Sequence, residues 1–200
     1  MVYCIASRRA VMGLAWAGSL ALLGACSEKK PVFNAIDISG GEMGRDFAIK
    51  DHNGQPRRLN DFAGKVLVVF FGYTQCPDVC PTTMTELVEV KRLLGKDGER
   101  LQPLFITVDP QRDTPELLKA YMANFDPGFL ALCPTPEQLA DVAASFKVYY
   151  KKVGDEKSAS YTMDHSAGSY VFDPKGRVRL FVRYGLGAQP LAADIAQLLG

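Results

Sequence analysis

The feature that most constrains the fold is a continuous apolar run at residues 65–71, Lys-Val-Leu-Val-Val-Phe-Phe. β-Branched and aromatic side chains without polar alternation are typical of a strand that is buried on both faces. Residues 104–108 form a second such run, and residues 129–132 form a shorter one. Because both faces of such strands must be covered, the chain needs layers of other elements on either side of a sheet.

Helical patterns alternate with these runs. Residues 82–94 carry apolar side chains at helical spacing, and Thr114 followed by Pro115 is a helix start, since threonine can cap and proline fits the first turn. Residues 135–138, Thr-Pro-Glu-Gln, form a capping box for the next helix, and a closing helix begins at Pro190.

Two hairpins complete the pattern. Asp-His-Asn-Gly at residues 51–54 predicts a turn between two short strands, and residues 173–176 predict a turn between strands 169–172 and 178–182. The order predicts an α/β protein with a thioredoxin-like fold: a central mixed β-sheet flanked by helices, with an N-terminal hairpin addition.

Composition narrows the function classes. The 200 residues are 48% hydrophobic, enough for a full core, and the formal net charge is +1. The chain has no basic block with interleaved aromatic residues, so we do not expect nucleic acid to be a partner.

The N-terminal segment resembles a secretory signal. Arg8 and Arg9 precede an uncharged run at residues 10–25, which is short for a membrane span. The run ends in Leu-Gly-Ala-Cys, which resembles the bacterial lipobox, whose cysteine is acylated; here that residue is Cys26. An uncleaved anchor helix with a chance cysteine is the alternative.

These features predict three regions: a lipoprotein signal peptide at 1–25, a tether at 26–43 and a folded domain at 44–200. The domain is expected to be exported and lipid-anchored to a bacterial membrane, facing the periplasm or another extracytoplasmic space.

Cys76 and Cys80 form a C-x3-C pair where a buried strand is followed by a helix. Free backbone N–H groups and the helix dipole stabilise a thiolate at such a place. The pair could close to a disulfide or hold a soft metal ion such as Cu(I) or zinc between two sulfurs. Its spacing does not separate redox chemistry from metal binding, and a plain structural disulfide or two core cysteines remain alternatives.

The chain has two histidines. His52 lies in the turn sequence and is expected at the surface. His165 precedes the strand at 169–172, where thioredoxins bring a loop close to their cysteines, so its imidazole could join the two thiolates in a trigonal Cu(I) site. Cu(II) would need another donor, such as Asp78, Asp164 or water. Taken alone, a loop histidine is more often a solvated surface residue.

Residues 71–83 closely resemble the signature of the Sco/SenC family of cytochrome oxidase copper-assembly proteins. Residues 108–115 resemble its second motif, with Gln111 where glutamate is usual, and residues 161–166 resemble its third. Residues 46–47 and 59–65 match the family's opening, so the resemblance covers roughly residues 44–200.

The resemblance implies that Cys76, Cys80 and His165 are copper ligands and that the two cysteines are also a redox-active pair. Cys133 stands where the family commonly shows threonine and is expected to be a small buried hydrophobe rather than a fourth ligand. We assign no ligand role to the second-motif residues and expect them to serve as turn and helix-start residues; they are Asp109, Arg112 and Asp113.

The implied function is that of a metallochaperone, which binds one copper ion and delivers it to the copper site of cytochrome c oxidase subunit II during respiratory-complex assembly. Another periplasmic copper chaperone or a thiol reductase is a further candidate partner. The main alternative is an enzyme, a thiol–disulfide oxidoreductase that reduces the oxidase cysteines. A peroxiredoxin-like peroxidase is weaker, because Thr74-Gln75-Cys76 is one residue short of Thr-x-x-Cys, and a structural or signalling module is a last alternative.

Overall fold

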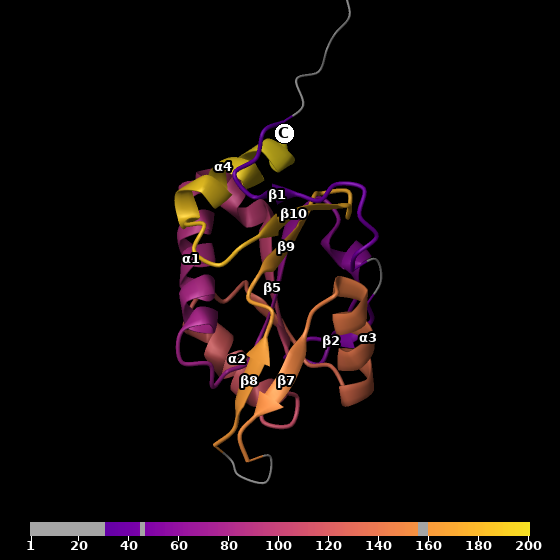
Figure 1. Ribbon diagram of the computed structural model, residues 1–200. Helices are drawn as coiled ribbons and strands as arrows, with labels where there is room; N and C mark the ends of the chain where they lie inside the picture. The colour runs from indigo at the N-terminus through magenta and orange to yellow at the C-terminus, as the bar shows by residue number, and fades with distance from the viewer. Residues whose placement is uncertain (1–30, 45–46, 156–159) are drawn as a thin grey trace, which may run out of the picture. The chain divides into compact units, whose positions relative to one another are not determined.

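A six-stranded mixed sheet forms the centre of the computed structural model, which describes residues 31–44, 47–155 and 160–200 (Figure 1). Its strands, in spatial order, are β1 (Ile36–Asp37), β10 (Val178–Val182), β9 (Ser169–Phe172), β4 (Val66–Gly72), β5 (Leu101–Thr107) and β6 (Leu130–Leu132). The pairs β4–β5 and β5–β6 are parallel, whereas β4–β9, β9–β10 and β1–β10 are antiparallel. This confirms the predicted mixed sheet.

The neighbouring interior strands β4 and β5 are buried along their whole length, as the apolar runs predicted. Successive side chains point to opposite faces of a strand. The ring of Phe70 therefore meets Phe105 on one face, with centroids 6.0 Å apart, while Phe71 meets Phe146 on the other at 5.2 Å. Both faces of the sheet thus carry core.

Helices cover both faces. Helices α1 (Val79–Leu93) and α4 (Ala188–Leu199) pack together on one side and α3 (Pro136–Phe146) lies on the other, with α2 (Pro115–Ala123) near the lower end of α1 (Figure 1). The predicted caps are present: the Thr114 side chain accepts a hydrogen bond from the N–H of Leu117, and Thr135 and Gln138 form the capping box. The described residues also form the 3-10 helices η1 (Leu59–Phe62) and η2 (Gly95–Arg100).

The predicted N-terminal hairpin is formed by β2 (Ile49–Lys50) and β3 (Pro56–Arg57). The buried carboxylate of Asp51 holds its turn together, because it accepts hydrogen bonds from the backbone of Asn53 and Gln55 and from the Arg57 side chain.

The predicted hairpin of β9 and β10 is present, but a third hairpin was not predicted. Strands β7 (Tyr150–Val153) and β8 (Thr162–His165) pair with each other, so His165 ends a strand rather than lying in a loop. The short alternating pattern of β8 carries charged and polar residues, which makes its sequence signal weak.

The structure differs from the predicted tether at 26–43 over the part of it that is described. The backbone N–H groups of Asn34 and Ala35 donate to the Asp194 carboxylate of α4, and β1 adds an edge strand to β10. These partners lie far along the chain, so no local pattern could reveal them. The predicted signal peptide at 1–25 and Cys26 lie outside the described residues. Within the described ranges, no helix combines the length and apolar character needed to cross a membrane.

Candidate metal centre

The cysteine pair follows directly after the central strand β4. The chain turns at Tyr73, whose carbonyl accepts a hydrogen bond from the N–H of Cys76, and α1 begins at Val79. Cys80 lies in the first turn of α1, but Cys76 lies before the helix. Pro77 explains the difference, since a residue before proline is disfavoured in helical conformation.

The two sulfurs nevertheless lie close together. The backbone N–H of Cys80 donates to Cys76 Sγ over 3.4 Å, so that sulfur accepts from a helix N-terminus. Cys80 is fully buried, whereas Cys76 is half-buried, and both are free thiols. Cys76 is therefore the more accessible sulfur.

His165 comes to the same place from the end of β8. Its Nε2 lies 3.9 Å from Cys80 Sγ, and its ring packs edge-on against Phe70 and Tyr73 with centroids 6.2 and 5.9 Å away. Its Nδ1 lies 3.1 Å from the carbonyl oxygen of Ser166. Since a carbonyl can only accept, this bond puts the proton of a neutral imidazole on Nδ1 and leaves the Nε2 lone pair free to bind a metal.

The three donor atoms fit one small ion. One sulfur each from Cys76 and Cys80 and one nitrogen from His165 all lie within 4.8 Å of one another. Metal–sulfur bonds of about 2.3 Å and metal–nitrogen bonds of about 2.0 Å would put the donors of a trigonal centre roughly 4 Å apart. Two thiolates and an imidazole are ligands for soft or borderline metals, not for calcium or magnesium. The side chains of Asp78 and Asp164 are exposed and are not part of this group.

The two thiols differ in proton affinity. The pKa of Cys76 is lowered to about 5, mainly because the Cys80 thiol donates a hydrogen bond to its thiolate, helped by the backbone N–H groups of Asp78 and Cys80. The pKa of Cys80 is raised, because ionising it would remove that hydrogen bond and because it is buried. At neutral pH the metal-free pair therefore holds one proton, on Cys80.

This difference predicts the pH dependence of alkylation. In the reduced protein, the rate for Cys76 with iodoacetamide should be level above about pH 6 and fall as the pH drops through about 5, since only the thiolate reacts. Mass spectrometry after short pulses measures the rate at each cysteine. Cys133, whose pKa burial raises to about 11, should stay slow over the same range. A Cys76 rate that still climbs above pH 8 would contradict the low pKa.

The other candidate ligands lie elsewhere. Cys133 is half-buried against the core, and its N–H donates to the Lys50 carbonyl, so it takes a packing position outside the donor group, as expected. His52 corrects the prediction of a plain surface residue: it is half-buried, and its Nδ1 accepts a hydrogen bond from the N–H of Ala131 over 3.1 Å.

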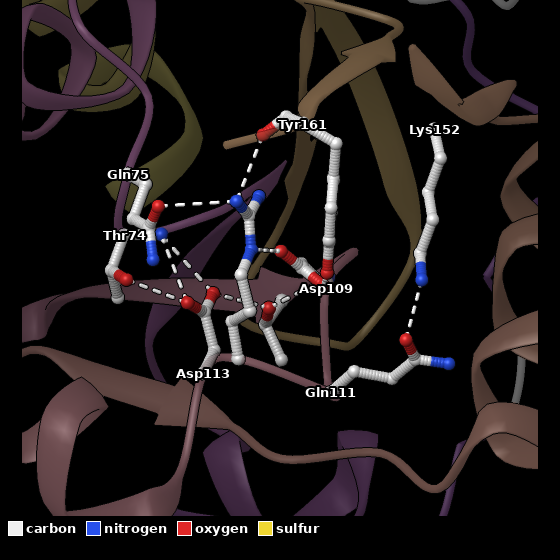
Figure 2. A network of polar contacts seen from close by, with 9 residues as sticks. Thr74, Gln75, Asp109, Gln111, Asp113, Lys152 and Tyr161 are labelled. Carbon is white, nitrogen blue, oxygen red and sulfur yellow. Dashed lines mark hydrogen bonds and ion pairs between the residues drawn. The ribbon is translucent and has the colours of Figure 1, made fainter. Parts of the chain in front are cut away.

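The second-motif residues do more than form a turn. The N–H groups of Arg112 and Asp113 donate to the Asp109 carbonyl, which is the expected turn. Their side chains also reach Thr74 and Gln75, directly before Cys76, and Tyr161, directly before β8 (Figure 2). These contacts are side chain to side chain or to distant backbone, so the sequence could not reveal them.

Fold and site together define a class: a thioredoxin-like domain in which two thiols and one imidazole converge at the end of the central strand. The family model described as SCO1/SenC matches residues 37–200. The chain therefore belongs to the SCO1/SenC family.

Individual Sco proteins are also similar to this chain in sequence and structure. A SCO2-like protein of Rickettsia conorii is 36% identical over 159 residues, which are 78% of this chain and 78% of that protein. The structure of Bradyrhizobium japonicum ScoI with copper bound is similar with a TM-score of 0.72 and 40% identity, over 78% of this chain and 99% of that one. The solution structure of apo Sco1 from Thermus thermophilus has a TM-score of 0.75 and 35% identity, and the match covers 84% of this chain and 97% of that one.

Proposed function

We propose that this protein binds one copper ion through Cys76, Cys80 and His165 and delivers it to the copper site of cytochrome c oxidase subunit II during assembly of the oxidase. The observation that carries the proposal is the convergence of the three donor atoms within 4.8 Å. The similarity to a ScoI structure with copper bound, at 40% identity, supports copper as the metal.

The chain's own groups suit uptake and release of copper as cargo. Cys76 offers a thiolate at neutral pH, and His165 offers its Nε2, because its Nδ1 lies against the Ser166 carbonyl oxygen. Cys80 must lose its proton when copper binds, so binding releases a proton and weakens in acid. Because Cys76 is the accessible sulfur, an incoming ligand of the partner would displace it first, and copper would move one donor at a time.

The asymmetry of the pair favours a second function, reduction of a disulfide in the oxidase. The Cys76 thiolate would attack one sulfur of the partner's disulfide and form a mixed disulfide, releasing the other partner sulfur as a thiolate. Cys80 would lose its proton and attack Cys76, forming the Cys76–Cys80 disulfide. The partner's second sulfur leaves as a thiolate, so two electrons and the Cys80 proton pass to the partner, which takes its other proton from solvent and leaves as a dithiol.

Titration of the two redox states tests copper binding directly. Under anaerobic conditions the reduced protein should bind one Cu(I) per chain, and the protein with a Cys76–Cys80 disulfide should bind none tightly, because the disulfide consumes both thiolates. X-ray absorption should show two sulfurs and one nitrogen on the metal. The Cys133→Ala variant is the control and should still bind one ion. Equal binding by the oxidised protein would overturn the three-donor site.

We further propose that the mature chain begins at an acylated Cys26 and is held to a bacterial membrane from the extracytoplasmic side, with the lipobox-like sequence at residues 23–26 as the support. Mass spectrometry of the mature N-terminus in a bacterial host would detect the lipid, and an unmodified or uncleaved N-terminus would contradict the proposal.

A further inference from the structure

The histidine of the site stands on a hairpin outside the central sheet. Strands β7 and β8 form a two-stranded sheet of their own and, in the described part of the chain, have no ladder with the six-stranded sheet. A two-stranded hairpin is marginally stable alone. The cysteines, in contrast, follow β4 in the central sheet. Side-chain contacts therefore help to set the distance between the sulfurs and the imidazole, together with the short connection from His165 to β9.

The guanidinium of Arg112 links the loop before the cysteines to the strand that carries His165. Arg112 Nη1 donates to Gln75 Oε1 over 3.1 Å, next to Cys76, and to the Tyr161 carbonyl over 2.8 Å, next to β8 (Figure 2). The same guanidinium lies over the Tyr161 ring, 3.6 Å from its centroid. It thus holds the loop before the cysteines and the strand that carries His165.

One carboxylate pairs with this guanidinium, and a second holds the cysteine loop beside it. Asp109, 1% exposed, pairs with Arg112 Nε and accepts a hydrogen bond of 2.7 Å from the Tyr161 hydroxyl. Asp113 accepts from the hydroxyls of Thr74 and Thr107, both over 2.6 Å, and so ties the cysteine loop to the end of β5. Because charge-assisted hydrogen bonds are short and directional, these contacts fix the positions of the side chains that they join.

We propose that Arg112 is a positioning residue, which holds the Cys76 loop and the His165 strand at metal-binding separation before any metal arrives. It touches none of the three donor atoms and acts through Gln75 and Tyr161. Partners of this kind typically change metal affinity because they fix the orientation of the ligands. The guanidinium reaches Gln75 and Tyr161 through Nη1 while its Nε pairs with Asp109, and the single Nζ of a lysine cannot occupy both nitrogen positions.

A measurement without metal tests the positioning itself. In reduced wild-type protein, NMR should show a nuclear Overhauser effect between the His165 ring and the Cys80 side chain, whose Nε2 and Sγ lie 3.9 Å apart. It should vanish in Arg112→Met and weaken in Arg112→Lys, while effects between β4 and β5 persist. The matched control is Arg92→Met, since Arg92 is 68% exposed on α1 and pairs with Glu89. An unchanged effect in folded Arg112→Met would overturn the proposal; Arg112→Lys decides the question if Arg112→Met does not fold.

A double-mutant cycle tests whether Arg112 affects copper affinity, and this test rests on the proposed copper binding. Arg112→Met should lower Cu(I) affinity about 10–100-fold in the wild-type background, as substitutions of residues that orient metal ligands do in other proteins. In the His165→Ala background, Arg112→Met should lower the Cu(I) affinity less than about threefold, because the ligand that Arg112 positions is gone. Equal losses in both backgrounds would overturn the proposal. If wild-type protein binds no copper, the proposed function fails, yet the metal-free comparison still decides the role of Arg112.

Discussion

Replacing His165 with alanine should abolish tight copper binding while leaving Cys76 and Cys80 able to exchange disulfides. Loss of a metal ligand should cost at least about 100-fold in Cu(I) affinity, the upper end of what outer-shell changes cost. The rate of disulfide exchange should change by less than roughly threefold, because the low pKa of Cys76 depends first on Cys80 and only last on His165. Competition with a Cu(I) chelator and the rate of reduction of a model disulfide measure the two activities.

Two variants make this result specific. Cys80→Ala should lose both activities, since it removes a metal ligand and the thiol that resolves the mixed disulfide. His52→Ala removes the chain's other imidazole, which bonds Ala131 rather than the site, and should keep both. Delivery to the oxidase by His165→Ala at the wild-type rate would show that copper transfer is not the function of this site, and the disulfide reductase would remain.

Gly72→Ala should damage both the core and the site. A Cβ at this position would lie 2.8 Å from ring carbons of Phe70 and Phe105 and 2.9 Å from Cys80 Sγ, closer than real Cβ contacts come. Rigid rings and a buried thiol must therefore shift, and we expect the free energy of unfolding to fall by about 1–3 kcal/mol, as in other overpacked cores. Urea denaturation measures the loss, and copper affinity should fall as Cys80 Sγ moves.

A second substitution separates these two effects. Phe105→Leu removes the ring on one side, so the double variant Gly72→Ala/Phe105→Leu should be more stable than the sum of the single losses predicts. The contact with Cys80 Sγ stays, so copper affinity should not recover. Additive stabilities, with wild-type copper affinity in Gly72→Ala, would contradict the close approach seen here.

The regular elements of the central sheet could be predicted because their signals are local. The apolar run at 65–71 became β4, and the Thr114 and Thr135 caps start their helices as expected. Strand β8 was missed because it has only four residues, of which Thr162 alone favours a strand and Asp164 disfavours one. The donor residues were found through motif resemblance, since a lone histidine 85 positions from Cys80 carries no local signal.

The sequence by itself determined the layered α/β architecture and the paired cysteines, because burial patterns, caps and motif spacing are set by neighbouring residues. His165 was identified only through the resemblance of its motif to that of a known family. Only the tertiary structure decided that Cys76 precedes the helix, that residues 34–37 join the domain, and that Arg112 links the cysteine loop to the His165 strand. The reason is physical. Each of these depends on hydrogen bonds or sterics between specific atoms, most of them far apart in the chain, whose distances exist only once the core has packed.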